Sequence, residues 1–341
     1  MRRPIKTKIL PAHTPALFQA AVRQAAEALR AGEVVALPTE TVYGLAANAL
    51  DPKAVARIYQ VKGRPAHNPI IVHVAGKALA RRCVARWPVV ADKLARCFWP
   101  GPLTLVLPKS EIIPDIVTAS GPTVGVRWPS HPFIRAVIRE CGFPLAAPSA
   151  NLAGRVSPTT AEHARRQLGG RIRLIVDGGP SPIGIESTVL DLTTQPPRVL
   201  RPGMIHHESL AAVIGEVRSA RCEVRGGDGT LRSPGWLKKH YAPRAKVLIL
   251  SWRDAFNLKS QISNLKFQPD AAWIVAHTHV PAAAGFAGVS VLPHEAEAYA
   301  RALYAEWHRC DDARAALIVM EAPPDLPEWN ALADRLRRAA A

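Results

Sequence analysis

The stretch Leu37-Pro38-Thr39-Glu40-Thr41-Val42-Tyr43-Gly44-Leu45 follows directly on the apolar run 34–37. The apolar run predicts a buried strand, and the Pro and the polar residues after it predict a loop at the strand's end. In α/β proteins, ligand groups gather at such junctions. Thr and Glu after a strand also fit a helix cap. A plain turn has no need of two Thr, a Glu and a Tyr together, so the stretch indicates one wall of a site for a small polar substrate.

Short apolar runs and helical patterns alternate around this stretch, which predicts a mixed α/β sheet. A helix is predicted over 14–31, with Thr14 as its cap, Pro15 in its first turn and Gly32 at its end. The other predicted strands are 70–74, 103–107, 124–127, 174–177, 188–192 and 198–200. The other predicted helices are 52–61, 77–86, 89–97, 131–141 after a cap at Ser130, and 159–168 with a capping box Thr159-Thr160-Ala161-Glu162.

A second regular unit is predicted after a break at about 215–245. The Gly-rich segment 225–230 predicts a linker. Strands are then predicted at 246–250, 272–276, near 289 and at 315–320, with helices near 254–265, 294–309 and from 327. This alternation predicts a small Rossmann-like sheet, to which we assign no dinucleotide because Gly-x-Gly-x-x-Gly does not follow its first strand. The predicted domains are 1–213, a linker 214–245 and 246–341.

Composition narrows the class of protein. The chain has 341 residues, 48% of them hydrophobic, and no apolar run long enough to cross a bilayer. Its first residues do not resemble a signal peptide, so we expect a cytoplasmic protein. The five cysteines form no metal spacing or disulfide framework. With 44 Lys and Arg against 27 Asp and Glu, the net charge is +17. That charge suits ATP, pyrophosphate or RNA as partners, or equally a generally basic surface.

A basic cluster lies between helix 52–61 and the next strand. Lys62 and Arg64 are two residues apart with a Gly between them, and Pro65 and Pro69 restrict the loop. One cation is a point charge and the other a rigid fork, a pair that suits a phosphate chain. An exposed basic loop is the ordinary alternative. His73, in the strand that follows, fits a core histidine bonded to backbone.

Three further motifs place polar groups at strand ends. Arg127 ends an apolar strand, where an Arg can bind a carboxylate or simply lie on the surface. The segment 147–159 supplies hydroxyls and an amide before a helix, which suits an anion but also satisfies ordinary turns. Segments 184–191 and 199–203 repeat the pattern. Each motif has an ordinary explanation alone, and the ordered set is much more specific.

In this order, the motifs resemble the YrdC-like domain and, with the tail, the long form of the threonylcarbamoyl-AMP synthase family. The resemblance covers about 14–210 and resumes at Ser233-Pro234-Gly235 and at His240-Tyr241-Ala242-Pro243. It implies a twisted sheet with a deep basic cavity. It also implies a nucleotidyltransferase that converts L-threonine, bicarbonate and ATP into threonylcarbamoyl-AMP and pyrophosphate, with Mg²⁺ on the phosphates. The product would feed a transferase complex that modifies adenosine 37 of tRNA.

The resemblance also implies roles for individual residues. Lys62 and Arg64 would be the catalytic cations, and no metal ligand is assigned to a protein side chain. The residues implied around threonine are Thr41, His73, Arg127, Ala147 and Ser187. Those implied around ATP are Lys62, Arg64, Asn68, Thr123, Ser149, Ser157, Arg201 and, as a lid, Tyr241. The chain departs from the family at Ala46, where Gly is common, and at Trp236-Leu237, which replaces Met-Lys.

Two alternative functions remain beside this one. A carbamoyl-transfer protein of hydrogenase maturation also contains a YrdC-like domain, but such chains carry paired-Cys zinc motifs and an acylphosphatase unit that are missing here. An RNA-binding module would use the basic cavity without catalysis, and weak RNA binding is compatible with either function. No Ser-His-Asp set or nucleophilic Cys is evident, and the implied reaction needs none. Both implied reactants are anions, so positioning and electrostatics would dominate catalysis. The second domain could be a lid, a docking surface or a dimer contact.

Overall fold

The computed structural model describes residues 5–219 and 241–341, which divide into two compact units. Within the described residues, the first unit comprises 5–153 and 157–219, and the second comprises 154–156 and 241–341. Most of the predicted linker lies at 220–240, outside the described residues, together with segment 225–230, Ser233–Gly235, Trp236-Leu237 and His240. Residues 218–219 pair with a strand of the first unit, so the chain remains part of that unit beyond the predicted boundary at 213.

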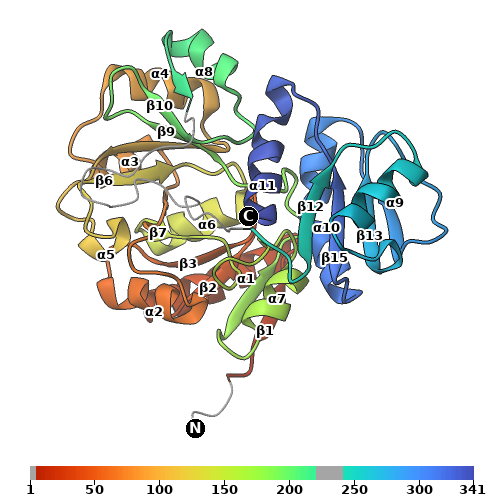
Figure 1. Ribbon diagram of the computed structural model, residues 1–341. Coiled ribbons are helices and arrows are strands. Elements are labelled where there is room, and N and C mark those ends of the chain that lie inside the picture. Colours follow the sequence, from red (N-terminus) through yellow and green to blue (C-terminus); the bar gives the residue numbers. More distant parts are fainter. Residues whose placement is uncertain (1–4, 220–240) are drawn as a thin grey trace. The chain divides into compact units, whose positions relative to one another are not determined.

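The first unit is built on one mixed sheet, with its strands in the order β1-β8-β2-β3-β7-β4-β6-β5-β9-β10-β11 (Figure 1). The strands are β1 Lys8–Pro11, β2 Val35–Leu37, β3 Gly44–Asn48, β4 Val72–His73, β5 Leu103–Pro108, β6 Thr123–Arg127, β7 Leu145–Ala146, β8 Leu174–Asp177, β9 Thr188–Asp191, β10 Arg198–Arg201 and β11 Arg218–Ser219. The helices are α1 Pro15–Arg30, α2 Pro52–Lys62, α3 Lys77–Cys83, α4 Val89–Phe98, α5 Asp115–Thr118, α6 Pro132–Cys141, α7 Ala161–Leu168 and α8 His207–Ile214. The predicted mixed α/β architecture is confirmed.

Strand β2 is buried on both faces because its side chains alternate between two hydrophobic clusters. Val35 and Leu37 belong to a cluster with residues of α1 and α6, whereas Ala36 belongs to a second cluster that includes residues of α2 and α4. Burying one Val or Leu side chain contributes about 1.5–3 kcal/mol. A strand buried on both faces reads as a continuous apolar run, which is why the sequence reveals it.

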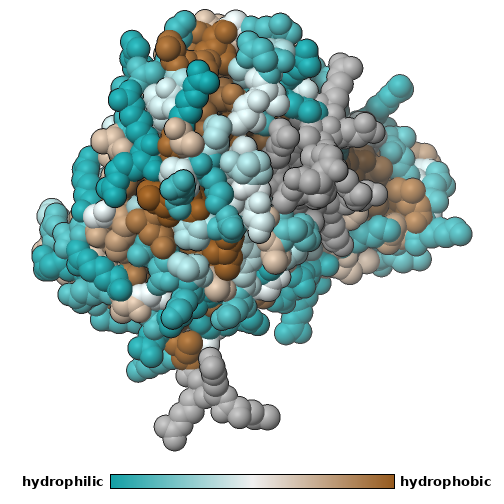
Figure 2. Space-filling view, turned by 90° about the vertical axis from the view of Figure 1, so that its left-hand side faces the viewer, coloured by the Kyte–Doolittle hydropathy of each residue, from teal (hydrophilic) through white to brown (hydrophobic). Residues whose placement is uncertain are grey.

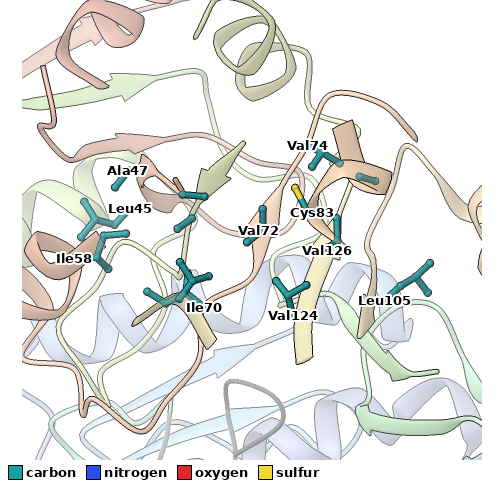
Figure 3. Packing of buried hydrophobic residues seen from close by; sticks show 14 of the residues in the cluster. Leu45, Ala47, Ile58, Ile70, Val72, Val74, Cys83, Leu105, Val124 and Val126 are labelled. Atoms are coloured by element: carbon teal, nitrogen blue, oxygen red, sulfur yellow. The ribbon is translucent and has the colours of Figure 1, made fainter. Parts of the chain in front are cut away.

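Members of the second cluster come from strands that are distant in sequence. Leu45, Val72, Val126 and Leu105 belong to four different strands, and Ile58 of α2 packs with them (Figure 3). These contacts place β3, β4, β5 and β6 in one layer, so the polar residues at the ends of those strands are held by a common core.

The stretch 37–45, predicted to form one wall of a site, contains the turn of a hairpin. Strand β3 starts at Gly44 and runs antiparallel to β2, with Leu37 opposite Gly44 and Val35 opposite Ala46. Ala46 is fully buried in an ordinary strand position. An alanine therefore fits this backbone position without strain.

Two predicted helix caps are wrong. The N-cap of α6 is His131, whose Nδ1 accepts from the Phe133 N–H at 3.2 Å, because Pro132 occupies the first helical position and moves the cap to its neighbour. The N-cap of α7 is Thr160, whose hydroxyl accepts from the His163 N–H at 3.2 Å. With Thr160 as the cap, the third helical residue is His163, so the capping box does not form.

The second unit contains a separate parallel sheet with the order β12-β15-β13-β14. Its strands are β12 Lys246–Leu250, β13 Ala272–Ala276, β14 Gly288–Val291 and β15 Leu317–Glu321, and its helices are α9 Ala255–Asn264, α10 Ala296–Asp312 and α11 Asn330–Ala340, with 3-10 turns Pro269–Ala271 and Pro327–Trp329. The predicted Rossmann-like unit is confirmed. The last strand lies between the first and second, an order different from that of dinucleotide-binding sheets.

A buried carboxylate closes the carboxyl end of this second sheet. Glu321, at the end of β15, accepts the backbone N–H groups of His277, Thr278 and His279 at 2.7, 2.9 and 3.0 Å. Burial raises the pKa of Glu321, but these bonds and the His279 side chain together hold it below its ordinary value. The carboxylate is therefore a fixed negative charge beyond β13.

The face of the molecule in Figure 2 is a mosaic of hydrophilic side chains and smaller hydrophobic areas. Among the residues that the structure describes, no helix combines the length and the apolar character that crossing a membrane requires.

Candidate active site

The turn between β2 and β3 connects the segments that carry the predicted site. Its backbone bonds to other segments are Tyr43 N–Pro158 O, Ala150 N–Tyr43 O, Ile183 N–Glu40 O and Gly184 N–Thr41 O, at 2.8, 2.8, 2.9 and 3.1 Å. The loops after β7 and after β8 are thereby joined to one short turn. Polar residues far apart in the sequence consequently meet around it.

Thr39 and Tyr43 of this turn stabilise the local structure through their hydroxyl groups. The Thr39 hydroxyl donates to Val42 O at 2.6 Å and lies 3.0 Å from the Thr41 hydroxyl. The Tyr43 hydroxyl donates to Gly179 O at 2.6 Å, and burial raises its pKa far above its ordinary value. Thr39 thus shapes the turn, and Tyr43 fixes the loop after β8.

Arg127 and Thr41, both predicted around threonine, are in direct contact. Arg127 Nη1 donates to the Thr41 hydroxyl at 2.9 Å, and Nε donates to Gly101 O at 3.3 Å. Nη2 lies 2.7 Å from Glu40 Oε1 in an ion pair whose side chains are 4% and 3% exposed. A buried guanidinium has five N–H donors, more than these partners use, so it can still bind an anion.

His73 lies beside Arg127 because β4 and β6 are parallel neighbours with these two residues in register. The His73 side chain is buried, and its Nδ1 has no hydrogen-bond partner within the described residues. Burial, followed by the charge of Arg127, lowers the pKa of His73 to about 3. Ala147 is held near this pair, since its N–H donates to Ile71 O at 3.1 Å. Because its pKa is this low, the His73 imidazole is neutral at pH 7.

The low pKa of His73 predicts a loss of stability in mild acid. The unfolded imidazole takes up a proton below its ordinary pKa of 6.5 while the folded one stays neutral, so stability is complete above pH 6.5 and falls steadily toward pH 3. We expect this group to remove about 2 kcal/mol of unfolding free energy between pH 7.5 and 5.0. Urea unfolding of the wild type and of His73→Gln at both pH values measures the difference. The exposed His67→Gln serves as control, and equal losses in all three proteins would contradict the prediction.

Ser187 is the centre of a second buried group. Its hydroxyl lies 2.8 Å from the Thr104 hydroxyl and accepts from Arg201 Nη2 at 3.0 Å, while its carbonyl accepts from Arg201 Nε at 3.0 Å. Next to it, Glu186 Oε1 accepts from the Ser157 hydroxyl at 2.6 Å. Ser187, predicted around threonine, is thus bonded to Arg201, and Glu186 is bonded to Ser157. Arg201 and Ser157 are both predicted around ATP.

Gly203 lies directly under this group, and its replacement should be costly. A Cβ at Gly203 would come within 2.4 Å of Thr188 N and 2.8 Å of Glu186 O, backbone atoms that cannot turn aside. We expect Gly203→Ala to lower the unfolding free energy by about 2–3 kcal/mol. Thermal unfolding should show a decrease of roughly 4–12 °C. Gly76→Ala is the matched control, because its Cβ would meet nothing within 4 Å. Similar melting temperatures for both variants would refute the close packing.

Lys62 is a buried cation at the end of α2. Gly63, in the left-handed conformation with φ 62°, ends the helix at Lys62. The Lys62 ammonium donates to Ser149 O and Asn151 O, both at 2.5 Å, and to Asn151 Oδ1 at 3.1 Å. Burial, followed by the charge of Arg64, lowers the pKa of Lys62 well below its ordinary value. An anion bound here would offset the free-energy cost of burying the charged ammonium.

Arg64 and Asn68 are fixed to each other at the start of the loop that leads to β4. Arg64 Nη2 donates to Asn68 Oδ1 and to Pro69 O, both at 2.7 Å, and Nε donates to Asn68 O at 3.1 Å. Pro69 also lines a pocket with Thr118, Thr123 and the side chains of Ile70, Ile71, Val106, Val124 and Val189. Thr123 thus lies on an apolar pocket beside the basic loop.

Tyr241, the predicted lid residue, belongs to the second unit. It is 1% exposed, its ring stacks on Tyr304 at 6.2 Å, and the Arg335 guanidinium lies 5.1 Å from the ring centre. These contacts lie within the second unit, so a nucleotide contact of Tyr241 stays a prediction.

Some residues of these groups were missing from the predicted site. No role is predicted for Glu40 or Glu186 from the sequence, although a Glu among apolar residues is a visible signal of a buried charge. Asn151 lies in segment 147–159 and likewise has no assigned role of its own. Thr104 gave no signal beyond a hydroxyl in an apolar strand. Across the described ranges, 5–219 and 241–341, no three His, Cys, Asp or Glu side chains form a group able to hold a metal ion.

Two family models match the chain. The model for the Sua5, YciO and YrdC proteins, described as "Telomere recombination", matches residues 27–203. A model described as the C-terminal domain of threonylcarbamoyl-AMP synthase matches residues 205–341. The two matches leave one residue between them, and the second includes the whole second sheet.

Individual relatives agree with these models. The threonylcarbamoyl-AMP synthase of Pyrococcus abyssi is 46% identical over 250 residues, 73% of this chain and 74% of the relative. That of Bacillus subtilis is 49% identical over 229 residues, 67% and 66% of the two chains. The crystal structure of P. abyssi Sua5 complexed with L-threonine superimposes with a TM-score of 0.90 at 37% identity, over 98% of both chains.

Proposed function

This chain belongs to the two-domain Sua5 family of threonylcarbamoyl-AMP synthases, and we propose that it is itself an L-threonylcarbamoyladenylate synthase. The proposed substrates are L-threonine, bicarbonate and ATP, and the products are threonylcarbamoyl-AMP and pyrophosphate. The buried Arg127 carries the proposal. It contacts Thr41 at 2.9 Å and adjoins the neutral His73, which suits recognition of a small amino acid by its carboxylate.

In the proposed reaction, the amine of threonine combines with bicarbonate and loses water to give a carbamate. A carbamate oxygen then attacks the α-phosphorus of ATP, and pyrophosphate leaves. Both reactants are anions, so the site must offset their repulsion and hold them in line. Arg127 and Ser187 would hold threonine, with Thr41 placed by its bond to Arg127. Lys62 and Arg64 would stabilise the charge that develops on the phosphates.

The phosphates of ATP are proposed to bind at Arg64 and Lys62, beside the loop that carries Asn68. The small pocket lined by Pro69 and Thr123 has a free volume of about 10 Å³, room for about one water molecule, so it is not assigned to the nucleotide base.

Mg²⁺ on the phosphates is part of the proposal. The ion prefers oxygen ligands and is commonly held by one or two carboxylates together with substrate phosphates. The buried Glu186, bonded to the Ser157 hydroxyl at 2.6 Å, supplies a carboxylate of this kind. Glu40 is already paired with Arg127. Bound there, Mg²⁺ would neutralise phosphate charge.

The proposed product is a reactive mixed anhydride, so it needs a partner that consumes it. We propose a tRNA threonylcarbamoyl transferase complex in the cytoplasm, which would modify adenosine 37. The net charge of +17 also suits weak direct RNA binding.

The test is the release of pyrophosphate from ATP by the full-length protein with each of the twenty amino acids, with and without bicarbonate. We expect release that requires both threonine and bicarbonate, and a mass spectrum of the product that matches threonylcarbamoyl-AMP. RNA binding without such release would favour the RNA-binding module instead. Release with carbamoyl phosphate in place of threonine and bicarbonate would favour the carbamoyl-transfer protein.

A further inference from the structure

Glu40 is a buried carboxylate that the proposed reaction does not use. Its Oε1 lies 2.7 Å from Arg127 Nη2 and accepts from the Ser130 N–H at 2.9 Å. Its Oε2 is buried without a hydrogen-bond partner within the described residues. Burial raises the pKa of Glu40, but the charge of Arg127 and the bonds from Ser130 and Arg127 hold it below its ordinary value. Glu40 is therefore ionised at pH 7.

The ion pair changes what Arg127 can attract. A lone buried guanidinium would attract any anion, and a triphosphate more strongly than a carboxylate because its charge is greater. Beside Glu40 the guanidinium is neutralised at close range. A second anion is then held by directed N–H bonds rather than by net charge, and Glu40 repels a polyanion more than a monoanion.

Lys62, another buried cation of the site, has a different environment. The bonds of Lys62 go to Ser149 O, Asn151 O and Asn151 Oδ1, which are neutral oxygens. No ion pair joins Lys62 to an acidic group within the described residues, so its charge is available to a polyphosphate. Of these two cations, Arg127 has a built-in counter-ion and Lys62 has none among the described residues.

We propose that Glu40 is a positioning and specificity residue, which fixes Arg127 for the carboxylate of threonine and keeps the triphosphate of ATP away from it. The inference rests on the proposed function. In this proposal Glu40 would contact neither substrate and would act through Arg127. Threonine and ATP thereby find separate ends of one basic site.

The experiment compares steady-state kinetics of wild type, Glu40→Gln and Glu40→Asp, with tripolyphosphate as inhibitor. In Glu40→Gln, which keeps the shape but loses the charge, we expect the KM for threonine to rise about tenfold. The KM for ATP should change less than about twofold, since no ATP contact is lost. Tripolyphosphate should compete only with ATP in the wild type and with both substrates in Glu40→Gln. Glu40→Asp should restore the wild-type inhibition pattern.

The matched control is Glu140→Gln, which removes an exposed carboxylate whose ion pair with Arg30 is 45–46% exposed. It should behave as wild type. An unchanged KM for threonine in Glu40→Gln, an equal rise in both KM values, or tripolyphosphate that still competes with ATP alone would overturn the inference. Should Glu40→Gln fail to fold, Glu40→Asp and the inhibition pattern of the wild type decide the question, and tripolyphosphate that competes with threonine in the wild type refutes it.

The two proposals fail separately. If the wild type binds threonine in calorimetry but releases no pyrophosphate, the proposed function fails. The role of Glu40 is then judged by the Kd for threonine and by its displacement with tripolyphosphate in wild type and Glu40→Gln. Normal pyrophosphate release with identical Kd values and identical displacement in both proteins removes only the role of Glu40.

Discussion

Replacing Lys62 with alanine is expected to lower threonine-dependent pyrophosphate release by about 100- to 1,000-fold. The loss of one preorganised group that stabilises transition-state charge has effects of this size. The ammonium is buried, and it donates to uncharged acceptors, the carbonyl oxygens of Ser149 and Asn151. Phosphate oxygens would therefore be its first charged partners. Quenched-flow or coupled pyrophosphate assays at saturating threonine measure the change in kcat.

The control for this experiment is Lys53→Ala, an exposed lysine in the first turn of the same helix. It should keep wild-type activity. The circular dichroism spectrum and threonine binding should be retained in Lys62→Ala, because none of the predicted threonine residues is a hydrogen-bond partner of the Lys62 ammonium. Turnover within about threefold of wild type would remove Lys62 from the catalytic set. Arg64→Ala should change activity in the same direction.

Replacing Arg127 with alanine is expected to weaken threonine binding by about 100-fold or more, because two charge-assisted hydrogen bonds to its carboxylate are lost. The same change leaves Glu40 buried without its counter-charge, since the Arg127–Glu40 contact of 2.7 Å disappears. We expect the unfolding free energy to fall by about 3–5 kcal/mol as a result. Isothermal titration with threonine and urea unfolding measure the two effects.

A double variant separates binding from folding. Arg127→Met combined with Glu40→Gln removes both charges and should recover most of the stability, while threonine binding stays lost. ATP binding should be similar in wild type and in the double variant. Threonine affinity close to wild type in the double variant would show that Arg127 does not bind the carboxylate.

The elements of the fold were predictable where burial imposes a period on the sequence. The helix at 14–31 and the strand Val35–Leu37 follow from their apolar patterns, and the whole alternation of the second unit was predicted in order. Strands β1, β3, β7 and β11 were not predicted, because segments of two to five residues are too short to show a clear period. Pairing with distant strands stabilises them, and a local pattern cannot reveal such partners.

The predicted site shows a similar division. Residue types that rarely occur by chance in a loop, such as Lys62 with Arg64, could be chosen from the sequence. Their actual partners could not, because Asn151 lies 89 residues from Lys62 and Glu40 lies almost as far from Arg127. Only the folded chain shows that a carboxylate in the opening turn neutralises an arginine at the end of β6. The substrate contacts themselves stay predictions.

The carboxylate of Glu321 has a consequence for the second unit. The N–H groups of His277, Thr278 and His279 follow a parallel strand, a place where nucleotide-binding sheets receive a phosphate from solution. Here the chain supplies the anion from its own β15. Because the Glu321 carboxylate belongs to the same chain, its effective concentration at these N–H groups is of millimolar order or higher. A phosphate of a free nucleotide would have to displace the Glu321 carboxylate from these N–H groups. The second unit therefore blocks this position with a side chain of its own.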